Sequence, residues 1–271
     1  MTFSIVARGA DGGSFGVAVA SKFLAVGSAV PAAEAGVGAI ATQSYANLAY
    51  RPQGLALLRT GADAEQTIAG LTAADPGRRT RQVGVVGPAG EGATFTGTEC
   101  NAWAGGRAGP GYACQGNILT GPDVVQAMEQ AWLAASDDTA LATRLLDALA
   151  AGDAAGGDKR GRQSAALYLV SPGGGYGGGS DVAVDLRVDD HPAPVPELAR
   201  LLELHELYFG RPDPADGIAL QGAVTDEVRR LLDRLGQPDL DTWMGVENYE
   251  ERALPGAIDP LVLAKLREAA Q

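Results

Sequence analysis

The order of strand-rich and helix-rich segments constrains the fold of this chain more than any single motif. Apolar residues alternate with the period of a strand in some segments and recur with the period of a helix in others. Each helix pair needs a sheet face to bury its apolar stripe, and consecutive hairpins give antiparallel sheets. The order therefore predicts an α+β fold, a four-layer αββα sandwich. Strands are expected at 2–8, 15–21, 37–43, 82–86, 93–97, 112–116, 164–170 and 182–188, and helices within 53–71 and at about 122–135 and 138–151.

Local signals agree with this division. The glycine-rich turn at 9–13 predicts a hairpin between the first two strands. The helical segment after the third strand is interrupted at 61–63, where Asp63 is expected to cap the second helix and Gln66 to complete a capping box.

The composition bounds the class of protein. A chain of 271 residues with 46% hydrophobic residues can bury a large core and can hold one larger domain plus a small one. No apolar run reaches about 18 residues, and the N-terminus lacks a basic region followed by a long apolar stretch. We therefore expect no membrane span, no secretory signal and a cytoplasmic location.

Charge and motif content narrow the partners. The net charge of −12 disfavours nucleic acids and anionic membranes, since both attract a positive surface. Cys100 and Cys114 lack the spacing of a zinc site, and we expect them to be reduced. His191 and His205 each stand alone, so neither a metal site nor a Ser-His-Asp triad is expected. The sequence has no phosphate-binding loop or dinucleotide motif, so no cofactor is predicted.

Thr2 directly follows the initiator methionine and begins the first strand. If Met1 is removed, Thr2 carries a hydroxyl nucleophile and a free α-amine, and an N-terminal amine is one recognised activator of a threonine hydroxyl. Threonine is common after methionine in any proteome, so this position alone does not separate a catalytic residue from an ordinary one. Ser4 shares the face of Thr2 one pleat further in and is expected to be buried.

Lysine is scarce in this arginine-rich chain. The lysines are Lys22, Lys159 and Lys265, and the first two lie in the segments with the most polar motifs. The pKa of a lysine shifts readily on burial, which suits it to proton transfer, whereas arginine stays charged. The alternative is that both are ordinary surface residues.

Several segments together resemble a known family. The sequence is similar to the bacterial family catalogued as domain of unknown function 1028 over about residues 2–205, and that family is grouped with the N-terminal-nucleophile (Ntn) hydrolases. Membership implies the Ntn fold more firmly than an activity. The segments that carry the resemblance are Thr2-Phe3-Ser4-Ile5-Val6-Ala7-Arg8, Gly16-Val17-Ala18-Val19-Ala20-Ser21-Lys22-Phe23, Gly36-Val37-Gly38-Ala39-Ile40-Ala41-Thr42-Gln43, Gln115-Gly116-Asn117 and Gly156-Gly157-Asp158-Lys159-Arg160-Gly161-Arg162-Gln163-Ser164.

The resemblance implies roles for particular residues. Thr2 would be the nucleophile, with Ser21 and Lys22 facing it from the end of the second strand. The lysine that follows this strand in the proteasome would fall near Val30 or Pro31, which cannot replace it, so Lys22 is the available substitute.

Further segments supply the expected surroundings of Thr2. The turn with Gln43 and Ser44 resembles an oxyanion-hole segment, and Gln115 and Asn117 lie where relatives carry polar groups near the nucleophile. The block with Asp158, Lys159, Gln163 and Ser164 resembles residues that orient the N-terminal residue in the proteasome family. Without the resemblance, the Asp158 block is most often a solvated turn, and Asn117 a loop or capping residue.

Lys22 and Asp158 are expected to converge beside Thr2 although they are far apart in sequence. Lys22 ends the second strand at the edge where the first strand begins, and Asp158 lies just before the strand at 164–170. Such a pair would keep Lys22 charged and lower the proton affinity of the Thr2 amine. The alternative places both residues in exposed turns on opposite edges.

The last part of the chain is expected to form a separate module. The predicted domains are residues 1–209 and a small, mainly helical unit at 210–271, which resembles a C-terminal appendage described as a peptidoglycan-binding domain. Its Trp243 and Tyr249 could instead form a small core, and this reading is preferred. The long apolar helix at 195–209 and open sheet edges predict a homodimer or larger assembly.

The function expected from the sequence is an Ntn-type amidohydrolase with Thr2 as nucleophile. Its substrate would be a small amide, a peptide or a cell-wall fragment such as a piece of peptidoglycan. The alternative is a non-catalytic ligand-binding or structural oligomer that kept the Ntn fold.

Overall fold

The structure is a computed structural model that describes residues 2–271. The chain divides into two compact units, Met1–Arg200 and Leu201–Gln271. The division falls inside helix α6 (Pro194–Phe209), whereas the sequence predicts a boundary at the end of that helix, between 209 and 210.

The first unit is mixed α/β and contains two antiparallel sheets. The six-stranded sheet has the order β10-β9-β2-β1-β8-β7, and the four-stranded sheet has the order β3-β4-β5-β6. The strands are β1 (Thr2–Arg8), β2 (Phe15–Ser21), β3 (Pro31–Glu34), β4 (Gly38–Ser44), β5 (Arg81–Val86), β6 (Ala93–Thr96), β7 (Gly105–Gly109), β8 (Tyr112–Asn117), β9 (Ser164–Val170) and β10 (Val182–Val188).

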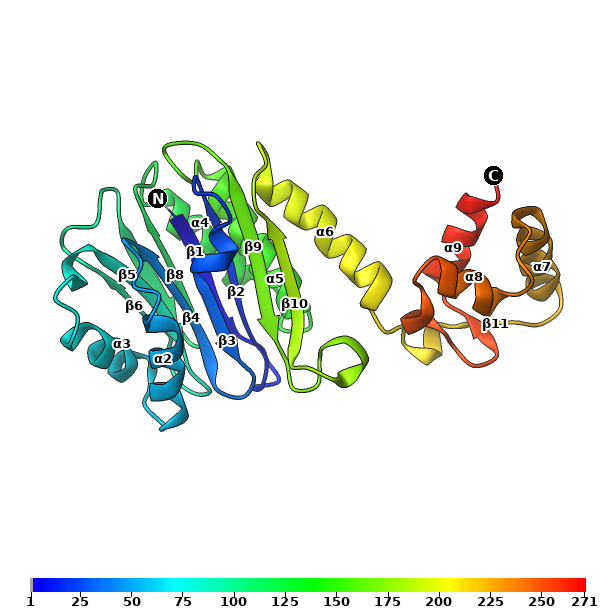
Figure 1. The fold of residues 1–271 in the computed structure, drawn as a ribbon, viewed down its shortest axis with the longest axis horizontal. Helices are drawn as coiled ribbons and strands as arrows, with labels where there is room; N and C mark the ends of the chain where they lie inside the picture. The colour runs from blue at the N-terminus through cyan, green and yellow to red at the C-terminus, as the bar shows by residue number, and fades with distance from the viewer. Residues whose placement is uncertain (1) are drawn as a thin grey trace. The chain divides into compact units, whose positions relative to one another are not determined.

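Helices cover the outer faces of both sheets (Figure 1). Helix α2 (Tyr50–Arg59) packs on β3 and β4, and α3 (Ala64–Ala73) packs on β5 and β6. On the six-stranded sheet, α4 (Asp123–Ala134) contacts β7 and β8, and α5 (Leu141–Ala154) contacts β1, β2 and β9. A short helix α1 (Val26–Ala29) connects β2 to β3.

The two sheets face each other across a buried layer. The inner face of β1 carries Val6, which lies opposite Val17 of β2 and Ala113 of β8. This layer is one contiguous apolar core toward the Arg8 end of β1 and along β2 and β9. Its buried members are Val6, Phe15, Val17, Val19, Val26, Val30, Ala39, Ala41, Val86, Ala113, Ala166 and Val170.

Several expectations from the sequence are confirmed. The structure is a mixed α/β fold with antiparallel sheets, and β1 and β2 form the expected hairpin. Asp63 accepts from the Gln66 backbone N–H while the Gln66 side chain accepts from the Asp63 N–H, which is the capping box. Ser4 is fully buried behind Thr2, as the strand period requires.

Two strands of the first unit were not expected from the sequence. Strand β3 is a four-residue edge strand beginning at Pro31, and β7 begins with Gly105-Gly106. Proline and glycine are depleted in strands, so the local sequence does not favour either one. Pairing with β4 and β8 supplies the stabilisation that the local sequence lacks.

The second unit contains helices α7 (Ala223–Leu235), α8 (Leu240–Val246) and α9 (Pro260–Ala269) and a two-stranded ribbon of β11 (Ile218–Ala219) and β12 (Ala257–Ile258). Trp243 and Tyr249 are buried in its core, with ring centroids 5.6 Å apart. Arg252 and Asp259 form a buried ion pair at 2.8 Å. The two aromatic rings therefore stabilise a small core, and neither is exposed for stacking on a sugar.

Within residues 2–271, no helix is both long enough and apolar enough to span a membrane.

Candidate functional site

The layer between the sheets changes from apolar to polar along four neighbouring strands. On β1 the inward side chains run from Val6 to Ser4 to Thr2, so polarity increases toward the start of the strand. The same change occurs on the facing and adjacent strands. The polar residues at that end are Gln43 on β4, Gln82 on β5, and Gln115 and Asn117 on β8, all of them buried.

Ser4 is held by two of these amides. Its Oγ donates to Gln43 Oε1 at 2.7 Å and accepts from Gln115 Nε2 at 2.7 Å. Gly84 lies beside Gln115, and a Cβ at that position would approach Gln115 Oε1 to 2.0 Å. Glycine on β5 is therefore what leaves room for the Gln115 amide between the sheets.

Gln82 joins the two sheets at the centre of the polar cluster. Its Oε1 accepts from Gln43 Nε2 at 2.8 Å and from Asn117 Nδ2 at 2.9 Å. Its Nε2 donates to the Gly116 carbonyl at 2.7 Å and to Thr96 Oγ1 at 2.9 Å. Burying so many polar groups is tolerated because nearly all of them are paired with one another.

Thr2 lies at the end of this cluster, and its side chain is largely shielded, with 7% of the residue exposed. Its Oγ1 is 3.1 Å from Ser21 Oγ on the neighbouring strand. Its carbonyl accepts from Gln43 Nε2 at 3.2 Å and from Asn117 Nδ2 at 3.5 Å. Backbone and hydroxyl of Thr2 are therefore both fixed by side chains expected to surround it.

Asn117 acts here as a positioning group. The two acceptors of its Nδ2 are Gln82 Oε1 and the Thr2 carbonyl. Both hydrogens of the amide are used by these acceptors. A direct oxyanion role for the Asn117 amide would require breaking one of these bonds.

Asp158 approaches the same edge of the sheet from the loop before β9. Its Oδ2 accepts the Lys22 backbone N–H at 2.7 Å, and its Oδ1 accepts the Arg160 N–H at 2.8 Å. Its carboxylate also forms an ion pair with the Arg160 guanidinium at 3.4 Å. Asp158 is buried while Arg160 is exposed, so the carboxylate fixes the loop and the end of β2 together.

Lys22 contacts Asp158 as expected, but through its backbone and not through its side chain. The contact uses the backbone N–H of Lys22, whereas its exposed ammonium group donates to the Arg162 carbonyl at 3.3 Å. Arg160 supplies the cation beside the Asp158 carboxylate. The expected Lys22–Asp158 side-chain pair does not form among the described residues, because the chain turns outward directly after Ser21.

Ser164 explains that turn. Its Oγ accepts from the Val26 backbone N–H at 3.1 Å and donates to the Phe23 carbonyl. Ser164 therefore anchors the segment after β2 rather than contacting Thr2 directly. The Gln163 side chain donates to Asp190 Oδ1 at 3.2 Å, away from the polar cluster, and Lys159 is exposed in the loop.

A small pocket of about 190 Å³ opens next to Asn117, the strand partner of Thr2. Two of its residues, Ser44 (φ 68°) and Ile118 (φ 51°), have left-handed backbone conformations. This region is costly for a residue with a side chain, most of all for a β-branched one, and it is over-represented at functional sites. The lining residues are Ser44, Tyr45, Asn101, Asn117, Ile118 and Arg160.

Sequence reasoning missed two residues of this region. Gln82 was assigned to a strand without a role, although a glutamine on the same face as Gly84 and Val86 is an unusual interruption of an apolar pattern. Arg160 lies between Lys159 and Gly161, in the block that resembles the family, and only its contact with Asp158 reveals its position beside the pocket.

Among residues 2–271, no group of three or more His, Cys, Asp or Glu side chains is arranged to hold a metal ion. Cys114 is buried on β8, and burial raises the pKa of its thiol. Cys100 donates from Sγ to the Arg81 carbonyl at 3.2 Å.

Comparison with known proteins identifies the family. The family of unknown function DUF1028 matches residues 2–198, and the chain belongs to it. A crystal structure of protein SPO2555 from Silicibacter pomeroyi, assigned to DUF1028, is similar with a TM-score of 0.68 and 30% identity. The similarity covers 83% of this chain and 89% of the other. No curated protein matches the chain.

Proposed function

We propose that this protein is an Ntn-type amidohydrolase that uses Thr2 as its nucleophile after removal of Met1. The observation that carries the proposal is the polar end of the inter-sheet layer, where Gln43 and Asn117 hold the Thr2 carbonyl and Ser21 Oγ lies 3.1 Å from Thr2 Oγ1. A threonine at the start of a strand, fixed by buried amides, is the arrangement that an N-terminal nucleophile requires.

The arrangement of the first unit supports the choice of the Ntn class. Two antiparallel sheets face each other, α2 and α3 pack on one, and α4 and α5 pack on the other. This is the layer order expected of the Ntn fold. Fold alone does not define an activity, so the proposal depends on the surroundings of Thr2.

The proposed reaction is acyl transfer from an amide to water. Thr2 Oγ attacks the substrate carbonyl carbon while its proton passes to the α-amine of Thr2. The tetrahedral intermediate collapses when the C–N bond breaks, and the departing amine takes the proton from the α-ammonium group. Water then hydrolyses the Thr2 ester, which releases the acid and restores the hydroxyl.

The surrounding residues would divide the remaining work. Ser21 orients the Thr2 hydroxyl through their direct contact. Gln43 and Asn117 fix the Thr2 backbone, and Asp158 holds the end of β2 through the Lys22 N–H. Arg160, which lines the pocket, is the cation best placed to stabilise developing negative charge on a bound substrate.

The size of the pocket limits the substrate class. A volume of about 190 Å³ is below the range of about 300–1,000 Å³ for pockets that enclose drug-sized ligands. It therefore suits a small amide or the terminal residue of a peptide. Short peptides cut from the cell wall belong to this class, and the resemblance of the C-terminal unit to a peptidoglycan-binding appendage supports testing them first.

The test is covalent trapping of the N-terminal residue. Intact-mass analysis of purified protein is expected to show loss of about 131 Da for Met1, the precondition of the mechanism. A β-lactone should then add its whole mass to Thr2, because ring opening has no leaving group, and peptide mapping should place the ester on Thr2.

Three variants complete the test. Thr2→Ala should abolish the adduct, Thr2→Ser should retain it, and Thr60→Ala, an exposed threonine at the end of α2, should leave it unchanged. Full retention of Met1 in protein that still hydrolyses amides would exclude the N-terminal amine as the base. Removal of Met1 without any adduct would favour the alternative, a ligand-binding protein that kept the fold and lost the chemistry.

A further inference from the structure

A second cavity lies away from the Thr2 cluster, at the side of the first unit where the sheets differ in width. The six-stranded sheet extends to β9 and β10, whereas the four-stranded sheet ends at β3. The inner face of β10 is left partly uncovered, and a groove of about 490 Å³ forms there. We call it the edge groove; its lining residues are Gly27, Ser28, Pro31, Ala32, Ala33, Arg51, Pro52, Leu55, Tyr168, Val182, Asp185 and Arg187.

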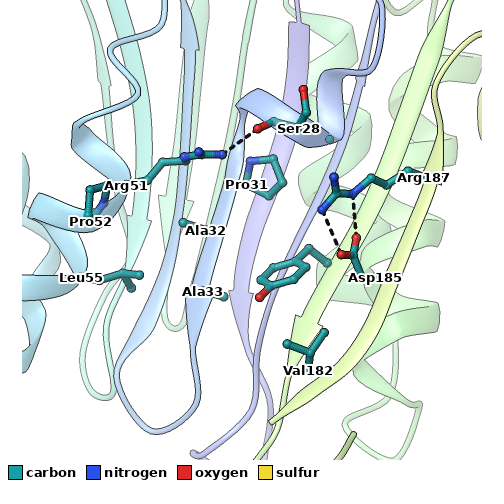
Figure 2. Close-up of a pocket in the computed structure, with 12 residues that line it drawn as sticks. Ser28, Pro31, Ala32, Ala33, Arg51, Pro52, Leu55, Val182, Asp185 and Arg187 are labelled. Atoms are coloured by element: carbon teal, nitrogen blue, oxygen red, sulfur yellow. Dashed lines mark hydrogen bonds and ion pairs between the residues drawn. The ribbon is translucent and has the colours of Figure 1, made fainter. Parts of the chain in front are cut away.

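Figure 2 shows that the walls of the edge groove come from different elements. Arg51, Pro52 and Leu55 stand on α2, while Asp185 and Arg187 project from β10 on the opposite side. Prolines, alanines and aliphatic side chains lie between them, and polar atoms contribute at least as much of the lining surface. A groove of this volume that combines apolar side chains with a few convergent polar groups can hold a small amphiphilic molecule.

The charges on the β10 wall neutralise one another. Arg187 donates to both carboxylate oxygens of Asp185, at 2.8 and 2.9 Å. A Cβ at Gly27 would lie 3.2 Å from Arg187 Cγ, so glycine there lets α1 pack closely on the arginine stem. The Asp185–Arg187 pair is thus held in place and contributes no net charge to the edge groove.

Arg51 supplies the uncompensated charge. Its Nη1 donates to the Ser28 carbonyl at 2.9 Å, and within residues 2–271 it has no carboxylate partner. It lies in the first turn of α2, which contains no acidic residue and where the helix dipole disfavours a cation. Because no carboxylate neutralises this guanidinium, its charge is left to pair with an anion in the edge groove.

Tyr168 provides a further polar contact. It is the strand partner of Asp185, and it packs against the apolar core between the sheets. Burial, reinforced by the nearby Asp185 carboxylate, raises the pKa of the Tyr168 phenol, so the hydroxyl remains a donor at neutral pH. Within the described part of the chain its hydroxyl has no hydrogen-bond partner, so it is available to a ligand oxygen.

The open strand edges beside the groove are poorly suited to pairing with another strand. Edge strand β3 begins with Pro31, which has no N–H to donate. Edge strand β10 has a register irregularity between Val182 and Val184. Both features are known protections against strand addition, so a small ligand fits this groove better than an added β-strand.

We propose that the edge groove binds a small monocarboxylate with an apolar body, whose carboxylate pairs with the Arg51 guanidinium and whose apolar part lies against Leu55, Pro31 and Val182. One uncompensated positive charge matches a monoanion better than a phosphate dianion, and the planar guanidinium matches a carboxylate in geometry. This site is independent of the reaction proposed at Thr2.

Isothermal titration of the full chain with phenylacetate and hexanoate tests the proposal. Each is expected to bind at one site with a Kd below about 1 mM, whereas phenylacetamide and hexanamide, which lack the charge, should bind at least about tenfold more weakly. Phenyl phosphate should bind no more tightly than phenylacetate. Binding of phenyl phosphate about tenfold tighter would overturn the assignment to a carboxylate.

Variants locate the binding. Arg51→Gln should weaken phenylacetate binding at least about tenfold, while Arg59→Gln, the same change on the same helix outside the groove, should alter it less than about twofold. Val182→Ser should weaken hexanoate binding without changing the fold, because Val182 is exposed.

Three outcomes would overturn the proposal. The first is that neither carboxylate saturates the protein by about 10 mM. The second is that Arg51→Gln leaves the affinity unchanged while the protein remains folded by circular dichroism. The third is that Arg51→Gln shifts the sedimentation coefficient and no carboxylate binds, which would mean that a second copy of the chain covers the groove.

Discussion

The two halves of the layer between the sheets are built from opposite kinds of side chain. Toward the Arg8 end of β1 the layer consists of Val6, Phe15, Val17 and their apolar neighbours. Toward the Thr2 end the same strands carry Ser4 and a set of buried amides. The change occurs on β1, β4, β5 and β8 at the same level, whereas β2 and β9 keep Val19 and Ala166 there, so it belongs to four strands and not to one.

The two halves contribute differently to the stability of the fold. Apolar side chains in a sheet interior are stabilised by burial alone, at about 25 cal/mol per Å² of apolar surface. A buried amide gains little net stability even when it is paired, and it costs about 1–3 kcal/mol if a partner is lost. The polar half therefore adds little to the stability of the fold, and its structural effect is to fix the position of Thr2.

Gln82→Leu should have the largest effect on stability. Leucine has a similar volume but removes the acceptor that Gln43 Nε2 and Asn117 Nδ2 share and a side-chain donor to the Gly116 carbonyl. Unpaired buried groups of this kind should lower the free energy of unfolding by about 4 kcal/mol. Urea denaturation followed by circular dichroism measures the change.

The matched control is Gln53→Leu, on the exposed side of α2. It should change the free energy of unfolding by less than about 0.5 kcal/mol. Equal effects of the two substitutions would mean that the hydrogen bonds of Gln82 contribute no more to stability than a surface glutamine does. The contrast between the two halves would then have no energetic basis.

Asp75→Asn tests a charged cluster beside the uncharged polar half. The Arg81 guanidinium, helped by donors from Tyr50, Asn47 and the Gly77 N–H, holds the pKa of Asp75 well below its usual range despite burial. Arg81 also donates to the Tyr45 carbonyl at the wall of the small pocket. The substitution should cost about 2 kcal/mol at pH 7.

The pH dependence of this effect has a definite sign. A carboxyl whose pKa is lowered by folding stabilises the folded state above its unfolded pKa of about 3.9 and loses that contribution as the pH falls further. The difference in unfolding free energy between the wild type and Asp75→Asn should therefore shrink from pH 5 toward pH 2. A difference that stays constant over this range would contradict the role of the Asp75 charge.

Val17→Thr places a hydroxyl in the apolar half without changing the side-chain volume much. Val17 is fully buried opposite Val6, in a contiguous apolar cluster. An unpaired buried hydroxyl should lower the free energy of unfolding by about 1.5 kcal/mol. A smaller cost, within about 0.5 kcal/mol of zero, would show that polar groups are tolerated throughout the layer and that the division into halves is unimportant.

Much of the fold could be predicted from local pattern. Strand alternation placed Ser4 behind Thr2 on one face, and the Asp63 capping box marked the start of α3. The same alternation could not assign Gln82, because a polar residue in a strand is normally read as facing solvent. Only the pairing of β4 with β5, and the packing of β5 on β8, shows that it faces inward.

Other features depend on contacts that are distant in sequence. The direction of the Lys22 side chain follows from Ser164, which anchors the segment after β2 from the start of β9. The edge groove follows from the unequal number of strands in the two sheets, and β3 could not be recognised from its short, proline-containing sequence. The sequence pattern therefore predicts where helices and strands lie, but it does not predict the direction of a loop or the number of strands in a sheet.

Ser21→Ala should have the smallest effect on stability and separates structural from functional need at the polar end. Ser21 lies at the end of β2, and its Oγ contacts the Thr2 hydroxyl at 3.1 Å. Loss of the Ser21 hydroxyl should cost about 0.5–1 kcal/mol of unfolding free energy. If Ser21 orients the nucleophile, the rate of β-lactone addition to Thr2 should fall by about tenfold or more, because misplacing a reacting group costs more in rate than in stability.

The control is Ser164→Ala, a serine on the adjacent strand that contacts the Phe23–Val26 segment and not Thr2. Compared with Ser21→Ala, it should lose more stability and less of the rate of β-lactone addition. Equal rates for Ser21→Ala and wild type would leave Ser21 as a packing residue and would place the orientation of Thr2 on Gln43 and Asn117 alone.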